Sequence, residues 1–249
     1  MKINARITLV MLIFLVVLAA TIITASHVII SSDYNSLEEG HARNAIKQAS
    51  LLIRSDLDGR ERVVTDWAVW NDTYRFLENP AGNSDYILDN FDDTVFLNLD
   101  LDYLVFYGSD GGVVYAGRFN RATGLIEPVP EHSLAYLGSA LAHLDPDNPE
   151  PVSGIMAADH GLIIAAAQRV RPTIDSGRSN GVLRMARNLD ETRLAQYRQL
   201  TSSSLSILPP DSPALPEEVR AMLIAGNGAT DNILVRPADE SEIESYAAL

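Results

Sequence analysis

The stretch Asp66-Trp67-Ala68-Val69-Trp70-Asn71-Asp72-Thr73-Tyr74-Arg75-Phe76 holds both tryptophans of the 249-residue chain. On a helix, Trp67, Trp70 and Tyr74 recur at i, i+3 and i+7, so the spacing predicts three large rings on one face. Such a face either docks a helix onto a sheet or closes the edge of a ligand pocket. In the second case the polar contacts to the ligand would come from Asp66, Asn71 and Asp72.

Residues 33–79 are predicted to form one long stalk helix that ends in this motif, because no proline occurs before Pro80. Two stripes of apolar or small residues follow helical spacing. One stripe comprises Ala42, Ala45, Ala49 and Leu52, and the other Ile46, Ile53, Leu57, Val64 and Trp67. The two stripes indicate either two partners, namely the sheet of the same domain and the same helix in a homodimer, or one broad core face.

An apolar run precedes the stalk. Residues 7–32 contain no formal charge when His27 is taken as neutral. A helix of this length can cross a bilayer with some tilt. Lys2 and Arg6 precede the run, so the positive charges predict a cytoplasmic N-terminus at 1–6 and an extracytoplasmic remainder. A cleaved signal peptide is the alternative, but its apolar region is usually shorter. The expected location is the cytoplasmic (inner) membrane, with the bulk of the chain periplasmic or extracellular.

Charge and motifs exclude several functions. The formal net charge is −14, and beyond residue 32 the chain carries 17 basic and 33 acidic residues, a formal −16. That surface argues against binding of nucleic acid. With no cysteine there are no disulfides and no thiolate sites. No catalytic motif, no metal-ligand spacing of histidines and no phosphate loop occurs, so we expect no cofactor and no metal.

Residues 80–249 predict an antiparallel sheet with helices gathered around it. One hairpin is expected from Leu101–Tyr107 and Val113–Arg118, and a second from Val152–Ala158 and Leu162–Val170. A loop over Arg121–Pro130, a helix over Glu131–His143, a strand over Val182–Asn188 and a helix over Glu191–Leu200 complete the pattern, with weaker elements at 205–208, 216–225, 232–235 and 243–249. This order indicates an α+β layer fold.

Arginines lie on or just before the predicted strands, at positions 118, 169, 171, 184 and 187. Inward-facing members could bind a carboxylate or phosphate bidentately, although surface pairing is the commoner outcome. The strand residues chosen as ligand-binding or signal-coupling candidates, beside those of the motif, are Tyr103, Tyr115, Arg118 and Arg187.

The motif at 66–76 resembles the signature of the fourth class of CHASE-type extracellular sensory domains. Weaker matches are Arg43-Asn44-Ala45, residues 86–90, Leu97-x-Leu99, Asp110-Gly111 and residues 185–190. The likeness covers roughly residues 33–249, and Asn71 departs from it, since an acidic residue is expected there.

The resemblance implies a PAS- or Cache-like sensor domain at 80–249 in a membrane receptor. It also implies a second membrane span and an output module after Leu249, such as a diguanylate cyclase, a cyclic-di-GMP phosphodiesterase or a histidine kinase. It supplies no ligand, so the partner is an undefined small molecule.

Three functions compete on this basis. The first is a ligand-sensing receptor domain that signals through its stalk and membrane helices. The second is a membrane-anchored extracytoplasmic enzyme that uses carboxylates near Asp66 and Asp72. The third is a scaffold that pairs with another receptor through the stalk. The motif lies between a membrane-linked helix and a sensor-like sheet, which favours the first.

Overall fold

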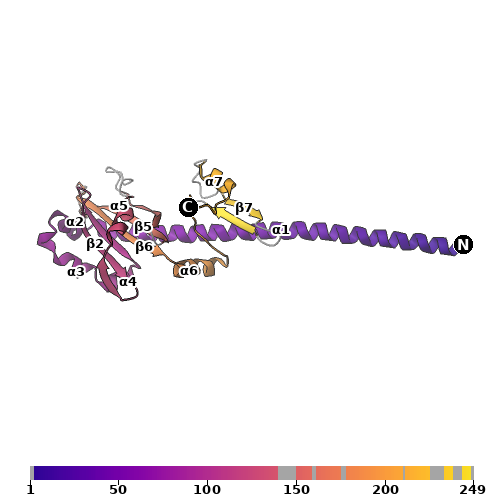
Figure 1. Ribbon diagram of the computed structural model, residues 1–249, viewed down its shortest axis with the longest axis horizontal. Helices are drawn as coiled ribbons and strands as arrows, with labels where there is room; N and C mark the ends of the chain where they lie inside the picture. The colour runs from indigo at the N-terminus through magenta and orange to yellow at the C-terminus, as the bar shows by residue number, and fades with distance from the viewer. Residues whose placement is uncertain are drawn as a thin grey trace. The chain divides into compact units, whose positions relative to one another are not determined.

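The computed structural model describes residues 3–139, 150–158, 161–174, 178–209, 211–224, 233–237 and 243–247 (Figure 1). The chain divides into two compact units. One comprises 1–50 together with 214–249, and the other comprises 51–213. The expected boundary between a stalk at 33–79 and a sensor domain at 80–249 therefore differs from the division by contacts, which places residues 51–79 of the stalk in the same unit as the sheet.

The larger unit is built on a six-stranded antiparallel sheet with the order β3-β2-β1-β6-β5-β4. Its strands are β1 (Tyr103–Gly108), β2 (Val113–Asn120), β3 (Leu125–Pro128), β4 (Val152–Ala158), β5 (Gly161–Val170) and β6 (Gly181–Leu189). The strand β6 lies at the centre, between β1 and β5. Gly181 begins it where only glycine fits, because a Cβ there would clash with the carbonyl of Tyr107.

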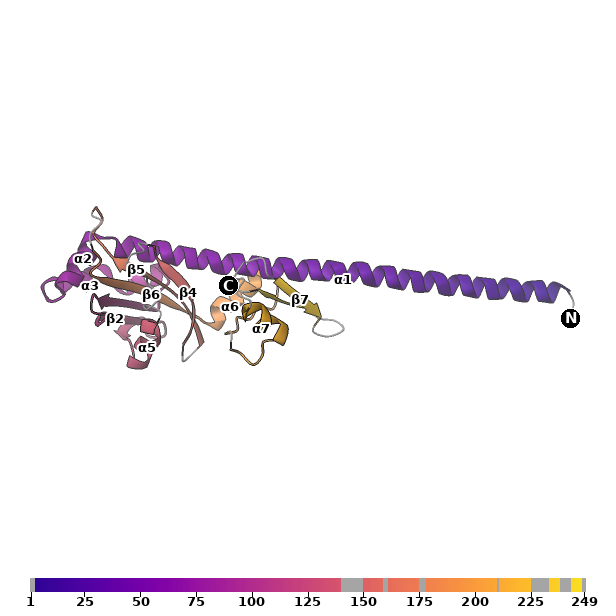
Figure 2. The same cartoon turned by 90° about the horizontal axis from the view of Figure 1, so that it is seen from above.

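Helices surround this sheet: α2 (Asn71–Glu78), η1 (Ala81–Asn83), α3 (Asp85–Asn90), α4 (Asp93–Asn98), α5 (Glu131–Ser139) and α6 (Glu191–Thr201). The first helix, α1 (Ile3–Ala68), contributes its C-terminal part to this unit. Figure 2 shows that part of α1 and α5 on opposite faces of the sheet. Each face therefore has its own core.

The core on the α1 face is aromatic. Val64 and Ala68 of α1 pack there with Phe76, Phe91, Phe96 and Phe106, while Leu183 and Met185 contribute from β6. The core on the α5 face is smaller and contains Tyr103, Val105 and Tyr107 of β1, with Leu137 of α5 and Ala165 and Ala186 of the sheet. Alternate residues of β1 and β6 thus point to opposite cores, as the period of a strand requires.

The prediction of one continuous helix through the motif is wrong. The helix α1 ends at Ala68, Trp70 is extended (φ −138°, ψ 137°), and α2 starts at Asn71. Hydrogen bonds from the segment after β5 hold the break: the N–H of Arg171 donates to the carbonyl of Ala68 at 3.1 Å, and the N–H of Thr173 donates to Oδ1 of Asn71 at 3.0 Å. The Ala68 carbonyl and the Asn71 side chain at the break therefore have partners in the segment that follows β5.

Both predicted hairpins, the strand over Val182–Asn188 and the helix over Glu191–Leu200 are confirmed. Asp190 caps α6 as its position indicated, accepting from the N–H of Arg193 at 2.9 Å. The loop expected over Arg121–Pro130 contains β3, and the weak strand expected at 205–208 is absent among the described residues. Residues 140–143 of the expected helix Glu131–His143 lie outside the described residues.

The smaller unit contains α1 up to Ser50, a short helix α7 (Glu217–Ile224) and the hairpin β7 (Ile233–Pro237) and β8 (Ile243–Ala247). Ser245 Oγ of β8 donates to the carbonyl of Ala42 on α1 at 3.1 Å. These elements match the weak expectations at 216–225, 232–235 and 243–249. Within the part of the chain that the structure describes, no helix combines the length and apolarity that a membrane crossing needs.

Candidate functional site

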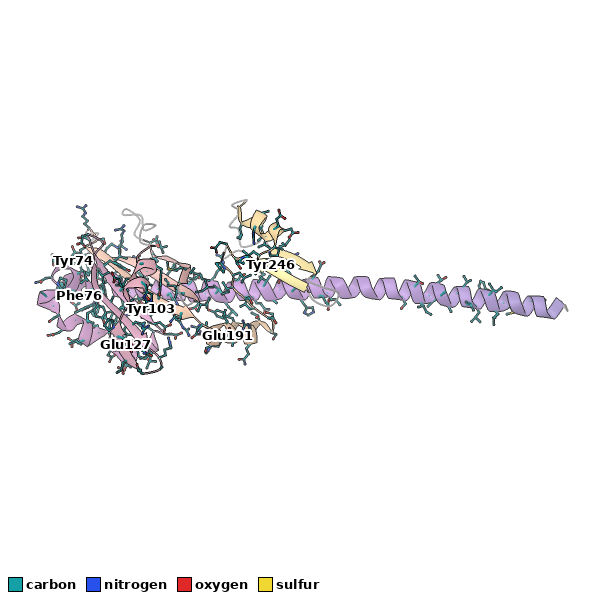
Figure 3. The ribbon with its side chains drawn as sticks, in the orientation of Figure 1. Tyr74, Phe76, Tyr103, Glu127, Glu191 and Tyr246 are labelled. Carbon is teal, nitrogen blue, oxygen red and sulfur yellow. The ribbon has the colours of Figure 1, made fainter. Side chains whose placement is uncertain are left out.

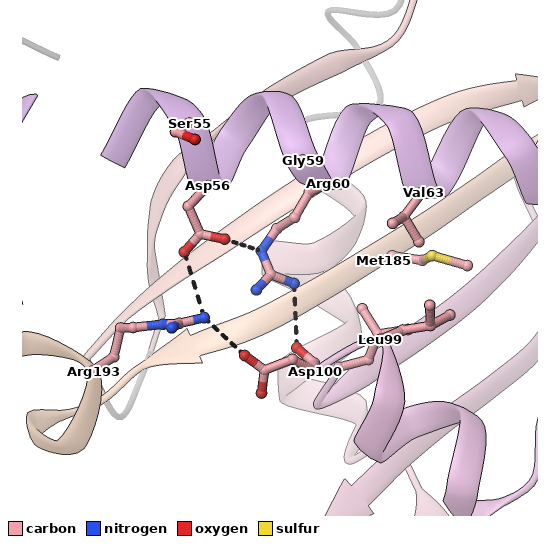
Figure 4. A pocket seen from close by; sticks show the side chains of 10 residues that line it. Ser55, Asp56, Gly59, Arg60, Val63, Leu99, Asp100, Met185 and Arg193 are labelled. Atoms are coloured by element: carbon pink, nitrogen blue, oxygen red, sulfur yellow. Dashed lines mark hydrogen bonds and ion pairs between the residues drawn. The ribbon is translucent and has the colours of Figure 1, made fainter. Parts of the chain in front are cut away.

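A network of opposite charges joins α1, the α4–β1 connection, β6 and α6 on the α1 side of the sheet. Figure 4 shows the part of it that Asp56, Arg60, Asp100 and Arg193 form. We call it the charged junction and define it by Asp56, Arg60, Asp100, Asp102, Arg121, Arg187, Arg193 and Tyr197. Side chains from segments far apart in the chain meet here.

The helix α1 contributes Asp56 and Arg60, which stand one turn apart and pair at 3.4 Å. Arg60 is 6% exposed, and its Nη1 also donates to the backbone carbonyl of Asp100 at 3.3 Å. Burial lowers the pKa of Arg60 from its usual value, and the negative charge of Asp56 opposes this effect only in part. Arg60 thus ties α1 to the segment that leads into β1.

Asp100 is the centre of the junction. Its carboxylate pairs with Arg121 at 3.0 Å, with Arg193 at 2.8 Å and with Arg187. Its backbone has φ +55°, a left-handed conformation that Asp and Asn tolerate better than most residues. This turn directs the carboxylate toward three guanidinium groups from β2–β3, β6 and α6.

Two further contacts complete the network. Asp102 accepts from Nε of Arg121 at 2.6 Å and from the N–H of Asn188 at 2.7 Å, and only 5% of its side chain is exposed. Tyr197 of α6 donates its hydroxyl to Asp56 at 2.7 Å. Burial and this hydrogen bond raise the pKa of Tyr197 above its usual value. The phenol therefore stays a donor to Asp56 near neutral pH.

A cavity of about 240 Å³ opens beside these groups. Asp56, Arg60, Asp100 and Arg193 line its polar side, and Val63, Leu99, Leu101 and Met185 line its apolar side. Ligand pockets for larger organic molecules usually occupy about 300–1,000 Å³. Because the cavity is smaller and its charges already pair with one another, the arrangement suits a linkage that can exchange partners better than an organic ligand.

The motif residues form a separate aromatic cluster at the α1–α2 break. The rings of Trp67 and Trp70 meet edge to face with their centroids 5.7 Å apart, and the centroids of Trp67 and Phe91 are 4.6 Å apart. The hydroxyl of Thr73 donates to the carbonyl of Trp67 at 2.6 Å and shares a hydrogen bond with the hydroxyl of Tyr86. Burial raises the pKa of Tyr86 to about 12. The rings thus pack against the sheet, as the core interpretation of the motif expects.

The polar members of the motif do not meet at the cavity. Asp66 is exposed, and Asp72 pairs at 3.0 Å with Arg75 on the surface. Asn71 holds the helix break through Thr173. Tyr74 is half-buried on α2, beside the buried Phe76 (Figure 3), and its carbonyl accepts from the amide of Asn180 at 2.8 Å. Their expected role at a pocket edge stays a prediction, and the geometry assigns Asn71 a structural contact.

The four strand candidates lie at different places. Tyr103 is buried on the α5 face, where burial, with a smaller contribution from Tyr136, raises its pKa to about 12. Tyr115 packs against Phe106 on the α1 face. Arg118 pairs with Glu127 at 2.7 Å between β2 and β3. Arg187 alone reaches the charged junction, through Asp100.

Sequence reasoning missed the remaining junction residues: Asp56, Arg60, Asp100, Asp102, Arg121, Arg193 and Tyr197. The i, i+4 spacing of Asp56 and Arg60 and the carboxylates that directly precede the first strand were the available signals. The described residues contain no group of three or more metal-ligating side chains. His160 and the acidic turn at 145–148 lie outside those residues.

Comparison with known proteins supports the fold. The sensory domain of the Campylobacter jejuni chemoreceptor Tlp3 matches with a TM-score of 0.52 at 12% identity, covering 87% of this chain and 90% of that one. The ligand-binding domain of the same chemoreceptor in complex with L-valine matches with a TM-score of 0.45 at 12% identity, covering 71% and 67%.

One curated relative is the methanogenesis regulatory histidine kinase FilI of Methanothrix harundinacea (strain 6Ac). It is 28% identical over 173 residues, which are 69% of this chain and 19% of the relative. The chain therefore spans about a fifth of that protein's length.

The fold is thus similar to that of a chemoreceptor sensory domain, and the curated relative is a histidine kinase. Residues 52–208 match the model of the CHASE4 domain, and the chain belongs to that family. The expected CHASE-type resemblance is confirmed.

Proposed function

We propose that this chain is the extracytoplasmic ligand-sensing part of a membrane receptor and that it transmits ligand state through α1. The charged junction carries the proposal, because it fixes α1 to the sheet by interactions that can exchange partners. The output module, whether a diguanylate cyclase, a phosphodiesterase or a histidine kinase, belongs to the part of the receptor beyond this chain.

The transmission step follows from how α1 is held. Asp56 has two donors, Tyr197 and Arg193 of α6, besides Arg60 of its own helix. Asp100 pairs with three arginines, and one of them, Arg193, is shared with Asp56. Arg193 thus lies between two carboxylates, at 2.8 Å from Asp100 and 3.7 Å from Asp56. A small movement of α6 or β6 would transfer Arg193 from one to the other. Ligand binding drives such a change only if it favours one arrangement.

The apolar run at 7–32 supports a membrane anchor for this receptor, with the sensor outside the cytoplasm. The exposed side chains of Ile13, Phe14 and Leu15 on α1 agree with a lipid environment for that segment. The proposal includes pairing of the stalk helices in a homodimer, because a movement of one helix relative to the other can carry the ligand signal along the pair.

A thermal-shift screen tests ligand sensing. The chain would be purified in detergent micelles and unfolded while tryptophan fluorescence is followed. Trp67 and Trp70 are the only tryptophans and both lie in the larger unit, so the signal reports that unit. A ligand at about 100 times its Kd stabilises by about 2.7 kcal/mol. That corresponds to a shift of roughly 5–11 °C for a domain of this size. A broad metabolite library that never shifts the transition would refute the proposal.

Cysteine crosslinking tests transmission. Because the chain has no cysteine, Asn44→Cys or Gln48→Cys places one thiol at an exposed position of α1. We expect disulfide formation between copies, at a rate that changes when ligand is added. Light scattering that shows only monomers, with no crosslink at either position, would exclude the homodimer.

A further inference from the structure

The strand β6 buries an arginine at the centre of the sheet, on the face that α5 covers. Arg184 is 3% exposed, and its register neighbours are Val105 on β1 and Ala167 on β5. Its Nη1 donates to the carbonyl of Leu137 in the last turn of α5, one of the carbonyls that a helix leaves without an internal partner. The side chain therefore lies between the sheet and α5.

Arg184 has no carboxylate partner in the part of the chain that the structure describes. It differs in this from Arg60, Arg118, Arg121, Arg187 and Arg193. Burial lowers the pKa of Arg184. Its Nε is buried, and no described atom accepts a hydrogen bond from it. Burying a charge without a counter-charge is unfavourable, so Arg184 lowers the stability of the unliganded fold.

A second unpaired donor lies beside it. Tyr107 is 3% exposed, and among the side chains that the structure describes none accepts a hydrogen bond from its hydroxyl. Arg184 acts electrostatically on this phenol, while Gly138 of α5 faces it: a Cβ there would lie 3.9 Å from the hydroxyl oxygen. Two donors, one of them charged, thus face the same space under α5.

Small residues lie on the same face of the sheet, in the row beside Arg184. Gly154 on β4, Ala165 on β5 and Ala186 on β6 follow one another across the sheet, and Ala167 flanks Arg184 in the next row. A Cβ at Gly154 would meet no described atom within 4 Å. Leu134, Tyr136 and Met156 pack against the same core. The surroundings of the two donors are therefore mostly apolar.

We propose that Arg184 and Tyr107 bind the carboxylate of a small organic acid beneath α5, with its apolar body over Gly154, Ala165 and Ala186. A carboxylate offers acceptors to both donors and supplies the missing charge. The apolar walls favour an organic acid over phosphate or sulfate. In the bound state the carboxylate replaces the Leu137 carbonyl as partner of Arg184, which releases that contact of α5. The inference rests on the proposed sensor function and assigns its ligand class.

The test uses the full chain in detergent micelles with tryptophan-detected melting and titration calorimetry. The probes are propionate, butyrate, isovalerate and benzoate, each with its neutral amide, and sodium sulfate and phosphate. We expect at least one carboxylate to raise the melting temperature, while its amide and the inorganic anions do not. Equal shifts with acid and amide, or with the inorganic anions, would overturn the assignment.

Three variants locate the site. Arg184→Met should weaken carboxylate binding about 100-fold and Tyr107→Phe about tenfold, as expected for a charged and a neutral donor. Gly154→Val should weaken binding by at least about tenfold through loss of space, with no loss of stability, since valine suits a strand. Arg75→Met, which removes an exposed pair with Asp72 on α2, is the control and should keep the wild-type affinity.

A purely structural role for Arg184 has a different signature. If the residue only anchors α5, Arg184→Met lowers the melting temperature without ligand by several degrees and leaves carboxylate affinity intact, which refutes the proposal. If another ligand class stabilises wild type and Arg184→Met equally, the carboxylate inference fails while the sensor function stands. If nothing in the full library binds, both fail.

Discussion

Asp100→Asn is the sharpest test of the charged junction. The substitution keeps the shape of the side chain and removes the negative charge that Arg121, Arg187 and Arg193 share. Asparagine also tolerates the left-handed backbone at φ +55°, so the change adds little strain. An alanine at this position would add about 1 kcal/mol of backbone strain and confuse the result.

The expected loss follows from the exposure of the partners. Arg121 retains Asp102, and Arg193 retains Asp56, so those two pairs lose little. The side chain of Arg187 is 9% exposed and pairs only with Asp100 among the residues described. Breaking a buried ion pair costs about 3–5 kcal/mol. Because the Asp100 side chain is 37% exposed and asparagine still accepts one hydrogen bond, we expect a loss of about 2 kcal/mol.

Urea denaturation followed by tryptophan fluorescence measures this loss as a change in the midpoint at constant slope. The same loss should lower the melting temperature by roughly 4–8 °C for a domain of this size. Asp72→Asn is the matched control, because it removes a pair whose side chains are 67% and 50% exposed and should cost about 0.5 kcal/mol or less. If Asp100→Asn falls within the range of that control, the junction does not hold α1 to the sheet.

Three further predictions concern the aromatic cluster. Trp70→Ala should lower the free energy of unfolding by about 2–3 kcal/mol, because the centroid of the half-buried ring lies 5.7 Å from that of Trp67 and 6.1 Å from that of Tyr86. Circular dichroism in urea measures this loss, and wild-type stability would show that the ring does not hold the break. Tyr86→Phe should cost about 1 kcal/mol through the lost hydrogen bond to Thr73, with Tyr74→Phe as a near-neutral control, and equal losses in both would contradict the assignment. Burial raises the pKa of Tyr86 to about 12, so the folded chain keeps this phenol protonated at a pH near 10, where the unfolded chain ionises. The stability that this difference contributes is complete below pH 10 and is lost as the pH rises through 12. In Tyr86→Phe the free energy of unfolding should therefore fall less steeply with pH.

Local patterns predicted most of the sheet because its turns have local chemistry. Gly111 adopts φ +80° and Gly161 φ +132°, and glycines between two strand-like segments are a local signal for such turns. The capped start of α6 was equally local. In contrast, β3 lies within the loop expected over Arg121–Pro130, because its pairing with β2 is a tertiary contact that local pattern does not show.

The break in the motif could not be predicted, since Val69 and Trp70 carry no helix-breaking signal. Its cause is tertiary: Thr173, 102 positions from Asn71 along the chain, donates to that side chain. The strand expected at 205–208 failed for a related reason. The carbonyl of Leu205 accepts from Nε of Arg198 at 2.9 Å, so this segment packs next to α6 instead of joining a sheet.

The charged junction was invisible for the same physical reason, because ion pairs join residues whose sequence separation has no fixed value. Asp100 lies 87 positions from Arg187 and 93 from Arg193. The sequence left the strand arginines open as either anion binders or surface pairs, and the fold separates them. Arg187 faces the junction, Arg118 pairs on β2, and Arg184 remains buried without a carboxylate partner among the described residues.

The strand β6 links the two sites, and this suggests how ligand binding could reach α1. Arg184 faces α5, and three residues later Arg187 faces the junction, where it holds Asp100. The backbone of β6 also holds Asp102 by two hydrogen bonds. The N–H of Asn188 donates to the Asp102 carboxylate at 2.7 Å, and the N–H of Asp102 donates to the carbonyl of Ala186 at 3.0 Å. A ligand that draws Arg184 away from Leu137 therefore acts on the strand that positions Asp100 and Asp102.

This coupling separates binding from response. Asp100→Asn leaves Arg184 and Tyr107 intact, so carboxylate affinity should stay within about threefold of wild type. The ligand-dependent change in crosslinking at Asn44→Cys should disappear, because α1 loses its charged link to β6. Crosslinking that still responds to ligand in Asp100→Asn would mean that the signal reaches α1 through the aromatic core instead.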